Sequence, residues 1–279
     1  MTVYNFAAQV TVSPRPSPDD VGGPAVPLLE ATASRYWRET GESPAPTHFQ
    51  LRTGIPFQVG LSGSSAIIIA ALRALAASQS KPLAPFEQAE IALAVEVEDL
   101  RIAAGPMDRV IQAYEGALHM DFAGPRHARA FTALDPRQLP PLLIAWDPRG
   151  GASSDGVHSE IRDRWNRGDR RVRQLMSGFR DITAVGTRAL RAGDHGTLRS
   201  AMDANFDLRA KLFPISPRDR EMVEVARSLG AAAKQCGSGG ACLVAPSRAR
   251  DQPTLHQRFA ALGYRTCSPQ LTPDEAPER

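Results

Sequence analysis

A glycine- and serine-rich stretch reads Pro56-Phe57-Gln58-Val59-Gly60-Leu61-Ser62-Gly63-Ser64-Ser65-Ala66. It follows an alternating segment, His48–Thr53, that is typical of a strand with one buried face. It leads into the run 66–78, which combines high helix propensity with an apolar face. The order of strand, glycine loop and helix therefore indicates that this stretch opens a helix at the end of a strand.

The chemistry that this stretch favours is phosphate binding. Consecutive backbone N–H groups at a helix N-terminus, with the positive end of the helix dipole, bind phosphate oxygens, and small residues let the backbone approach closely. Serine hydroxyls add donors and can serve as Mg²⁺ ligands. The stretch is not a Walker A loop, because no Gly-Lys-Ser/Thr follows. The alternative is a capped strand-to-helix junction without a ligand.

Acidic residues on both sides of a helix-breaking Gly-Pro pair form the second candidate group. Glu96 lies in the acidic helix end Glu96-Val97-Glu98-Asp99, and Asp108 follows the break at Gly105-Pro106. The break lets the chain fold back and point both carboxylates into one site, where one binds a metal and the other orients or deprotonates an attacking hydroxyl. The alternative is a solvated acidic helix end, with Asp108 as an N-cap-type residue near the next helix.

A second glycine loop occurs late in the chain and reads Lys234-Gln235-Cys236-Gly237-Ser238-Gly239-Gly240-Ala241. Glycines permit backbone geometry that other residues resist, so this loop can press against a bound ligand. The alternative is a tight turn into the strand Ala241–Ala245.

The remaining pattern predicts two α+β domains, residues 1–140 and 141–279. In the first domain we expect strands at 3–12, 48–53 and 116–122, with helices at 28–40, 66–78, 85–102 and 107–114. In the second domain we expect strands at 141–146, 241–245 and 264–271, three helical stretches over 157–213, a helix after Pro217 that ends at Gly230, and a helix at 254–262.

Composition narrows the function classes. Apolar residues make up 42% and charged residues 23% of the chain, with a net charge of +3, as in an ordinary globular protein. The longest apolar stretch, 66–72, is too short to span a bilayer, and the N-terminus lacks a signal-peptide pattern, so we expect a cytoplasmic protein without a membrane partner. Scattered arginines argue against nucleic-acid binding, and the cysteines lack metal-ligand spacing. The oligomeric state stays open.

In their order and spacing, the three groups resemble motifs of the GHMP kinase superfamily, named for galactokinase, homoserine kinase, mevalonate kinase and phosphomevalonate kinase. Residues 56–66 resemble its phosphate-binding second motif, and Gly105-Pro106-Met107-Asp108 resembles the segment that ends in a catalytic aspartate. Gly237-Ser238-Gly239-Gly240 resembles its C-terminal glycine motif, although many members carry a longer glycine string. The resemblance implies a ribosomal protein S5 domain 2-like N-terminal domain that binds ATP and a ferredoxin-like C-terminal domain.

Further segments are similar to the glucuronokinase branch of that superfamily. They include Asp108-Arg109-Val110, His119-Met120-Asp121-Phe122 and Asn205-Phe206-Asp207-Leu208-Arg209, and the resemblance covers nearly the whole chain, 3–271. Arg109 stands where most sugar-phosphorylating members have glutamine, a departure that this branch shares. The implied activity is ATP-dependent phosphorylation of a sugar hydroxyl, with the anomeric hydroxyl of a uronic acid such as glucuronic acid as the acceptor.

The resemblance also implies roles for the candidate residues. Asp108 is expected to receive or orient the proton of the attacking hydroxyl, while Ser65 and Glu96 hold Mg²⁺. Arg109 or Arg209 is expected to pair with a substrate carboxylate, with Asn205 as a further substrate-binding residue, and a structural ion pair is the alternative for either arginine. The residues expected to bind ATP are Pro56, Gly60, Leu61, Ser62, Gly63, Ser64, Ser65, Ala66, Gly237, Ser238, Gly239 and Gly240.

Three alternative functions stay open: a kinase for a heptose or another hexose, a nucleotide-binding relative with little turnover, and a decarboxylase of the same fold. One expected part is missing from the sequence. The first motif of the superfamily, a strand with sugar-contacting residues and a cation near the transferred phosphoryl group, has no counterpart here. We therefore expect the natural protein to begin upstream of Met1, by roughly 15–25 residues on strand and loop lengths.

Overall fold

The computed structural model describes residues 1–125, 130–151 and 155–272, and contacts divide the chain into two compact units. The first unit comprises Met1–Ile55 and Ser62–Phe131, and the second comprises Pro56–Leu61 and Thr132–Arg279. The sequence suggested a boundary between residues 140 and 141. In the structure the units change at Phe131, and the short segment Pro56–Leu61 counts with the second unit.

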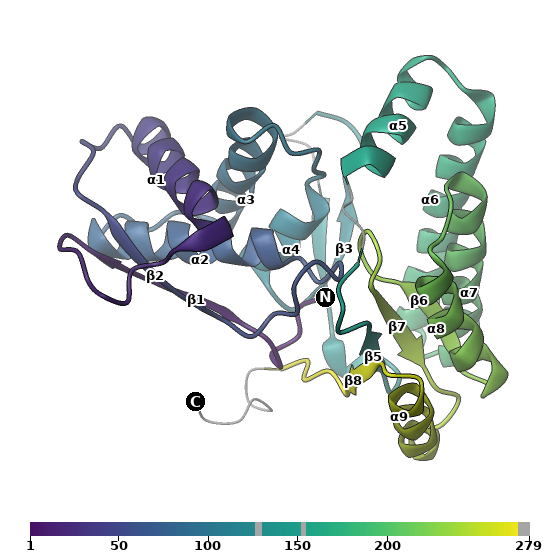
Figure 1. Cartoon of the computed structure of the whole chain (residues 1–279). Helices are drawn as coiled ribbons and strands as arrows, with labels where there is room; N and C mark the ends of the chain where they lie inside the picture. Colours follow the sequence, from purple (N-terminus) through teal and green to yellow (C-terminus); the bar gives the residue numbers. More distant parts are fainter. Residues whose placement is uncertain (126–129, 152–154, 273–279) are drawn as a thin grey trace. The chain divides into compact units, whose positions relative to one another are not determined.

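Helices packed with short strands make up the first unit (Figure 1, purple to blue). Strands β1 and β2 pair in antiparallel register, with Ala8 opposite Thr53 and Ser13 opposite His48. The strand expected from residue 3 begins only at Ala8, while β2 and α4 have the expected bounds. The elements are β1 Ala8–Ser13, α1 Val26–Thr40, β2 His48–Thr53, α2 Gly63–Ser78, α3 Pro85–Ala94, α4 Met107–Tyr114 and β3 Ala117–Asp121.

Helix α2 supplies much of the first unit's core. Its residues Ile68, Leu72 and Leu75 are fully buried, and they belong to the same apolar cluster as Leu29 and Tyr36 of α1. Spacings of three and four residues place such side chains on one helix face, which explains why this apolar sequence forms a buried helix. The helix also carries the serines of the first glycine stretch, so burial of α2 fixes their position.

Helix α3 ends earlier than the sequence suggested. The expected helix ran to residue 102, but α3 stops at Ala94 and continues as a π-helical turn, η2 Val95–Asp99. The turn is closed by a hydrogen bond from Leu100 N–H to the Val95 carbonyl. A π turn holds one residue more than an α turn and therefore changes the direction of the side chains within it. Glu96 lies in this turn.

A four-stranded antiparallel sheet with the strand order β6-β7-β5-β8 is the centre of the second unit (Figure 1, teal to yellow). Strands β4 and β6 were not expected; the alanine-rich residues that form β6 have weak strand propensity. Strand β4, Ala130–Leu134, spans the change of units at Phe131. The other elements are β5 Leu143–Trp146, α5 Asp155–Asn166, α6 Arg170–Arg191, α7 His195–Leu212, α8 Pro217–Ser228, β6 Ala232–Gln235, β7 Ala241–Ala245, α9 Gln252–Ala261 and β8 Arg265–Cys267.

Different helices pack against side chains from the two faces of this sheet. Met222 of α8 and Phe259 of α9 share a buried cluster with Ala233, whereas Met202 of α7 packs with Ala232. Successive side chains of a strand point to opposite faces, so α8 and α9 pack on the Ala233 face of β6. Helix α7 contributes to both clusters, with Phe206 in the Ala233 cluster and Met202 beside Ala232.

Side-chain caps mark where the long helices of the second unit begin. Asp169, Asp194 and Ser216 each accept a hydrogen bond from a backbone N–H in the first turn of α6, α7 and α8, respectively. Such caps satisfy N–H groups that have no partner within the helix. Within the described ranges, no helix combines the length and apolar character that crossing a membrane requires.

Candidate active site

The two glycine loops expected to bind ATP meet inside the second unit. A Cβ atom placed on Gly60 would lie 2.5 Å from the Cys236 carbonyl oxygen, and one on Gly237 would lie 2.6 Å from the Gly60 carbonyl oxygen. Gly60 also has a φ of +74°, which favours glycine. These positions are glycine because the two backbones touch, so the loops form one structure.

A third loop, which sequence reasoning did not single out, joins the other two. Gly151 N–H donates to the Gln58 carbonyl over 2.8 Å, and Asp147 N–H donates to the Gly240 carbonyl over 2.9 Å. The segment from Asp147 to Gly151 therefore connects the first glycine loop to the second. An aspartate directly after the buried strand β5, followed by two glycines, is the sequence signal that could have indicated it.

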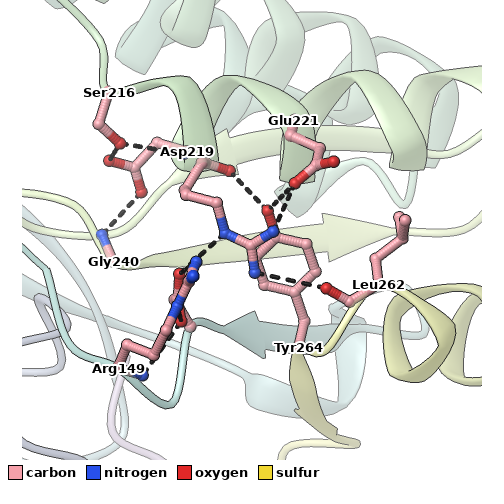
Figure 2. Close-up of polar contacts among 9 residues, drawn as sticks. Arg149, Ser216, Asp219, Glu221, Gly240, Leu262 and Tyr264 are labelled. Carbon is pink, nitrogen blue, oxygen red and sulfur yellow. Dashed lines mark hydrogen bonds and ion pairs between the residues drawn. The ribbon is translucent and has the colours of Figure 1, made fainter.

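Asp219 of α8 holds the second glycine loop through a hydrogen bond from Gly240 (Figure 2). Its carboxylate accepts hydrogen bonds from Gly240 N–H at 2.7 Å, from Ser216 Oγ at 2.7 Å and from Gln235 Nε2 at 3.2 Å. Gln235 Nε2 also donates to the Ser238 carbonyl. Asp219 is buried, and sequence reasoning missed it because it lies in a charge-rich helix whose contacts are long-range.

A network around buried Asp147 supports the third loop. Its carboxylate accepts hydrogen bonds from Arg149 and Arg218, and the Arg149 side-chain bond, followed by Arg218, holds the pKa of Asp147 well below its usual range. The Arg218 guanidinium lies 3.8 Å from the centre of the Tyr264 ring. Tyr264 donates a hydrogen bond to Glu221, and burial together with that bond raises the pKa of Tyr264 (Figure 2).

In the first unit, the serines at the start of α2 face the acidic π turn. Ser64 Oγ donates to Glu96 Oε1 over 2.8 Å, whereas Ser65 is fully buried and its Oγ has no hydrogen-bond partner among the described residues. We expected Ser65 and Glu96 to act together on Mg²⁺. The observed contact of Glu96 is instead with Ser64, one residue earlier.

Arg109 forms a buried ion pair with Glu96. Glu96 is 1% exposed and Arg109 is 6% exposed, and the guanidinium also donates to the Gly105 carbonyl over 2.9 Å. Arg109 was one of the two arginines expected to read a substrate carboxylate. In the structure its partner is the carboxylate of Glu96, which is the structural ion pair given as the alternative for this residue, and a buried glutamate needs such a counter-charge.

Asp108 lies in the first turn of α4 and faces solvent more than Glu96 does. Pro106, not Asp108, is the N-cap residue of α4, so the capping alternative for Asp108 does not hold. The Asp108 side chain is 38% exposed, and its Oδ2 lies 3.6 Å from Arg109 Nη1. The structure therefore brings both expected carboxylates to one guanidinium, with Glu96 buried and Asp108 accessible.

Arg209 and Asn205, the other expected substrate-binding residues, lie on α7 in the second unit. Arg209 Nη2 donates to the Gly237 carbonyl, and its guanidinium lies 4.7 Å from the centre of the Phe213 ring. Burial lowers the pKa of Arg209. Asn205 lies four residues earlier, on the same face of the helix as Arg209.

The oxygen atoms near Glu96 suit a hard cation. Among the described residues, no three His, Cys, Asp or Glu side chains gather into a metal site. Mg²⁺ is commonly bound by one or two carboxylates together with phosphate and water oxygens, so a site with one carboxylate and serine hydroxyls is compatible with it. The buried Ser65 Oγ without a protein partner fits such a ligand set.

Two family models match the chain. The model described as GHMP kinases N terminal domain matches residues 27–116, and the model described as GHMP kinases C terminal matches residues 187–264. The first match covers the start of α2, Glu96 and Asp108. The second covers Arg209, Asp219 and the second glycine loop.

Curated relatives and solved structures agree with these matches. Probable glucuronokinase 2 of Arabidopsis thaliana is 38% identical over a match that covers 75% of this chain and 60% of the relative. Glucuronokinase 1 of the same plant is 40% identical over a match that covers 69% of this chain and 55% of the relative. The chain therefore spans somewhat more than half the length of these relatives. The crystal structure of a D-glycero-D-manno-heptose 1-phosphate kinase from Bacteriodes thetaiotaomicron superposes with a TM-score of 0.71 at 17% identity, covering 94% of this chain and 83% of the other.

Proposed function

Because this chain belongs to the GHMP kinase family, we propose that it transfers the γ-phosphoryl group of ATP to a sugar hydroxyl. The acceptor that we propose is the anomeric hydroxyl of a uronic acid such as glucuronic acid. The names of the two Arabidopsis relatives support this acceptor. The structural observation that carries the proposal is the arrangement at Arg109, where one guanidinium lies between buried Glu96 and accessible Asp108.

ATP would bind on backbone groups of the glycine stretches. Residues 56–61 and Gly237–Gly240 form a joined loop structure in the second unit, and the chain continues from Leu61 directly into the first turn of α2. N–H groups in the first turn of a helix have no partner within the helix and are available to phosphate oxygens.

Mg²⁺ would be held by Glu96 together with the hydroxyls of Ser64 and Ser65. When bound, Mg²⁺ neutralises charge on the β- and γ-phosphate oxygens as the phosphoryl group moves. Ser64 already contacts Glu96, and the Ser65 hydroxyl has no other partner among the described residues. Arg109 compensates part of the Glu96 charge, so Glu96 would share its carboxylate between the guanidinium and the cation.

Asp108 is the residue that we propose as the catalytic base. Its carboxylate would take the proton of the acceptor hydroxyl while the hydroxyl oxygen bonds to the γ-phosphorus and the bond to the bridging oxygen of ADP breaks. Arg109, 3.6 Å away, would orient and stabilise the Asp108 carboxylate. Catalysis of this kind depends mainly on positioning and charge neutralisation, which a small number of residues can supply.

Product analysis with a panel of sugars tests the proposed function. The chain is incubated with ATP and Mg²⁺ and, separately, with uronic acids, neutral hexoses and heptoses, and phosphorus NMR identifies any sugar phosphate. We expect a uronic acid 1-phosphate as the main product. A heptose or hexose phosphate would instead assign one of the alternative kinases, and ATP binding without any sugar phosphate would assign a nucleotide-binding relative.

A further inference from the structure

Lys234, to which the proposed reaction gives no role, lies on the face of β6 that packs with Met202 of α7. Side chains alternate along a strand, so Lys234 shares its face with Ala232, and Ala232 packs against Met202 of α7. Lys234 is paired across the sheet with Leu243, which packs against the same cluster. Two independent neighbours, Ala232 and Leu243, therefore place Lys234 on the face of the sheet that Met202 contacts.

Residues of α7 form hydrogen bonds with the backbone both before and after Lys234. Before it, Ala233 N–H donates to Asp203 Oδ1 of α7 over 3.0 Å, and after it, Arg209 Nη2 of α7 donates to the Gly237 carbonyl. Helix α7 thus runs beside β6 from Asp203 to Arg209, past Lys234. Asn205 lies within this stretch, one turn before Arg209 and on the same helix face.

Among the residues that the structure describes, no carboxylate is ion-paired with Arg209 or Lys234, and the buried Nε atom of Arg209 has no hydrogen-bond partner. Burial lowers the pKa of Lys234, and the nearby charge of Arg209 lowers it further. The carboxylate of Asp219, which also acts on Arg209, is already bonded to Ser216, Gln235 and Gly240.

Arg109, a buried arginine in the first unit, differs from Arg209 because it has a carboxylate partner. Arg109 in the first unit is paired with Glu96, as burial of a charge requires. Arg209 and Lys234 are partly buried cations, and no described carboxylate forms an ion pair with either. Two such cations can together bind an anionic group of a ligand.

We propose that Arg209 and Lys234 together bind the carboxylate of the acceptor sugar, so that the chain selects acidic over neutral sugars. This inference rests on the proposed function and adds Lys234 to its substrate-binding residues. The planar guanidinium matches a carboxylate in geometry, while the ammonium adds a point charge. The Asn205 amide and the Gly237 carbonyl beside them offer a donor and an acceptor for sugar hydroxyls.

Selectivity between two sugars that differ only in the charged group tests this inference. Glucuronic acid carries a carboxylate where glucose carries a hydroxymethyl group, so we compare kcat/KM for both in the wild type and in Lys234→Met. We expect the variant to lose roughly 10- to 100-fold on glucuronic acid, the range for a hydrogen bond to a charged group, with a much smaller change on glucose. Lys211→Met, an exposed lysine on α7, is the matched control and should change neither value.

Binding measurements separate this inference from the proposed activity. Calorimetric titration with glucuronate and with ATP is carried out on wild type, Lys234→Met, Lys234→Arg and Arg209→Met, with thermal unfolding to show that each variant is folded. Weaker glucuronate binding in the two methionine variants supports the carboxylate site even if no phosphate is transferred, provided that Lys234→Arg keeps its glucuronate affinity and both Lys234 variants keep their ATP affinity. Equal losses for glucuronic acid and glucose, or a loss confined to ATP, would overturn it.

Discussion

At the scale of single residues, the charge of Arg109 links the two carboxylates of the first unit. Its guanidinium is paired with buried Glu96 and lies 3.6 Å from accessible Asp108. The π turn of η2 places Glu96 inward, and the turn at Gly105 accepts a further hydrogen bond from Arg109. We infer that Arg109 is a positioning residue, because its contacts are with protein groups and it is almost fully buried.

This assignment predicts a large effect on stability. Arg109→Met leaves the Glu96 carboxylate buried without a counter-charge, so the free energy of unfolding should fall by about 3–5 kcal/mol, measured by urea denaturation. The double variant Arg109→Met with Glu96→Gln removes the uncompensated charge and should recover much of the loss. If the single variant unfolds at the same urea concentration as the wild type, the buried pair is not formed in solution.

At the scale of elements, the glycine loops owe their shape to close backbone contact. Gly60 has a positive φ, and a Cβ there would press against the Cys236 carbonyl; the reciprocal contact exists between Gly237 and Gly60. Gly63, only three residues further on, differs from both. It begins α2, and a Cβ there would lie 3.6 Å from Ile55 Cγ2, which is an ordinary contact distance.

Two matched alanine variants therefore have opposite expectations. Gly60→Ala meets a carbonyl oxygen and adopts an unfavourable φ, so its free energy of unfolding should fall by at least about 1–3 kcal/mol. Gly63→Ala fits in the first turn of a helix, and its stability should stay within about 1 kcal/mol of the wild type. Thermal and urea unfolding of both variants measure the difference. Equal stabilities would mean that the joined loops seen here do not persist in solution.

At the scale of the whole molecule, local patterns could be predicted and long-range contacts could not. The bounds of β2, α4 and β7 follow from alternation, helix propensity and breaking residues close in sequence. The alanine-rich β6 could not be predicted in this way, because its strand form depends on pairing with β7. The assignment of Pro56–Leu61 to the second unit likewise depends on residues far away in the chain.

In the candidate site, too, local sequence patterns could be predicted and long-range contacts could not. Glycine loops and acidic residues could be recognised from residue type and spacing, since their chemistry requires these residues. The partner of Arg109 and the loop-holding role of Asp219 could not, because each depends on which buried groups meet after folding. The position of Lys234 beside Arg209 also follows only from the packing of α7 on β6.

Turnover of the Asp108→Asn variant shows whether Asp108 acts as the base in phosphoryl transfer to a sugar. The side chain is accessible and caps no helix, so the variant should fold and bind ATP as the wild type does. Uronic acid-dependent ADP formation should fall by roughly 10²-fold or more, the usual effect of losing a positioned base, while calorimetry shows unchanged ATP affinity. Turnover close to that of the wild type would contradict the account.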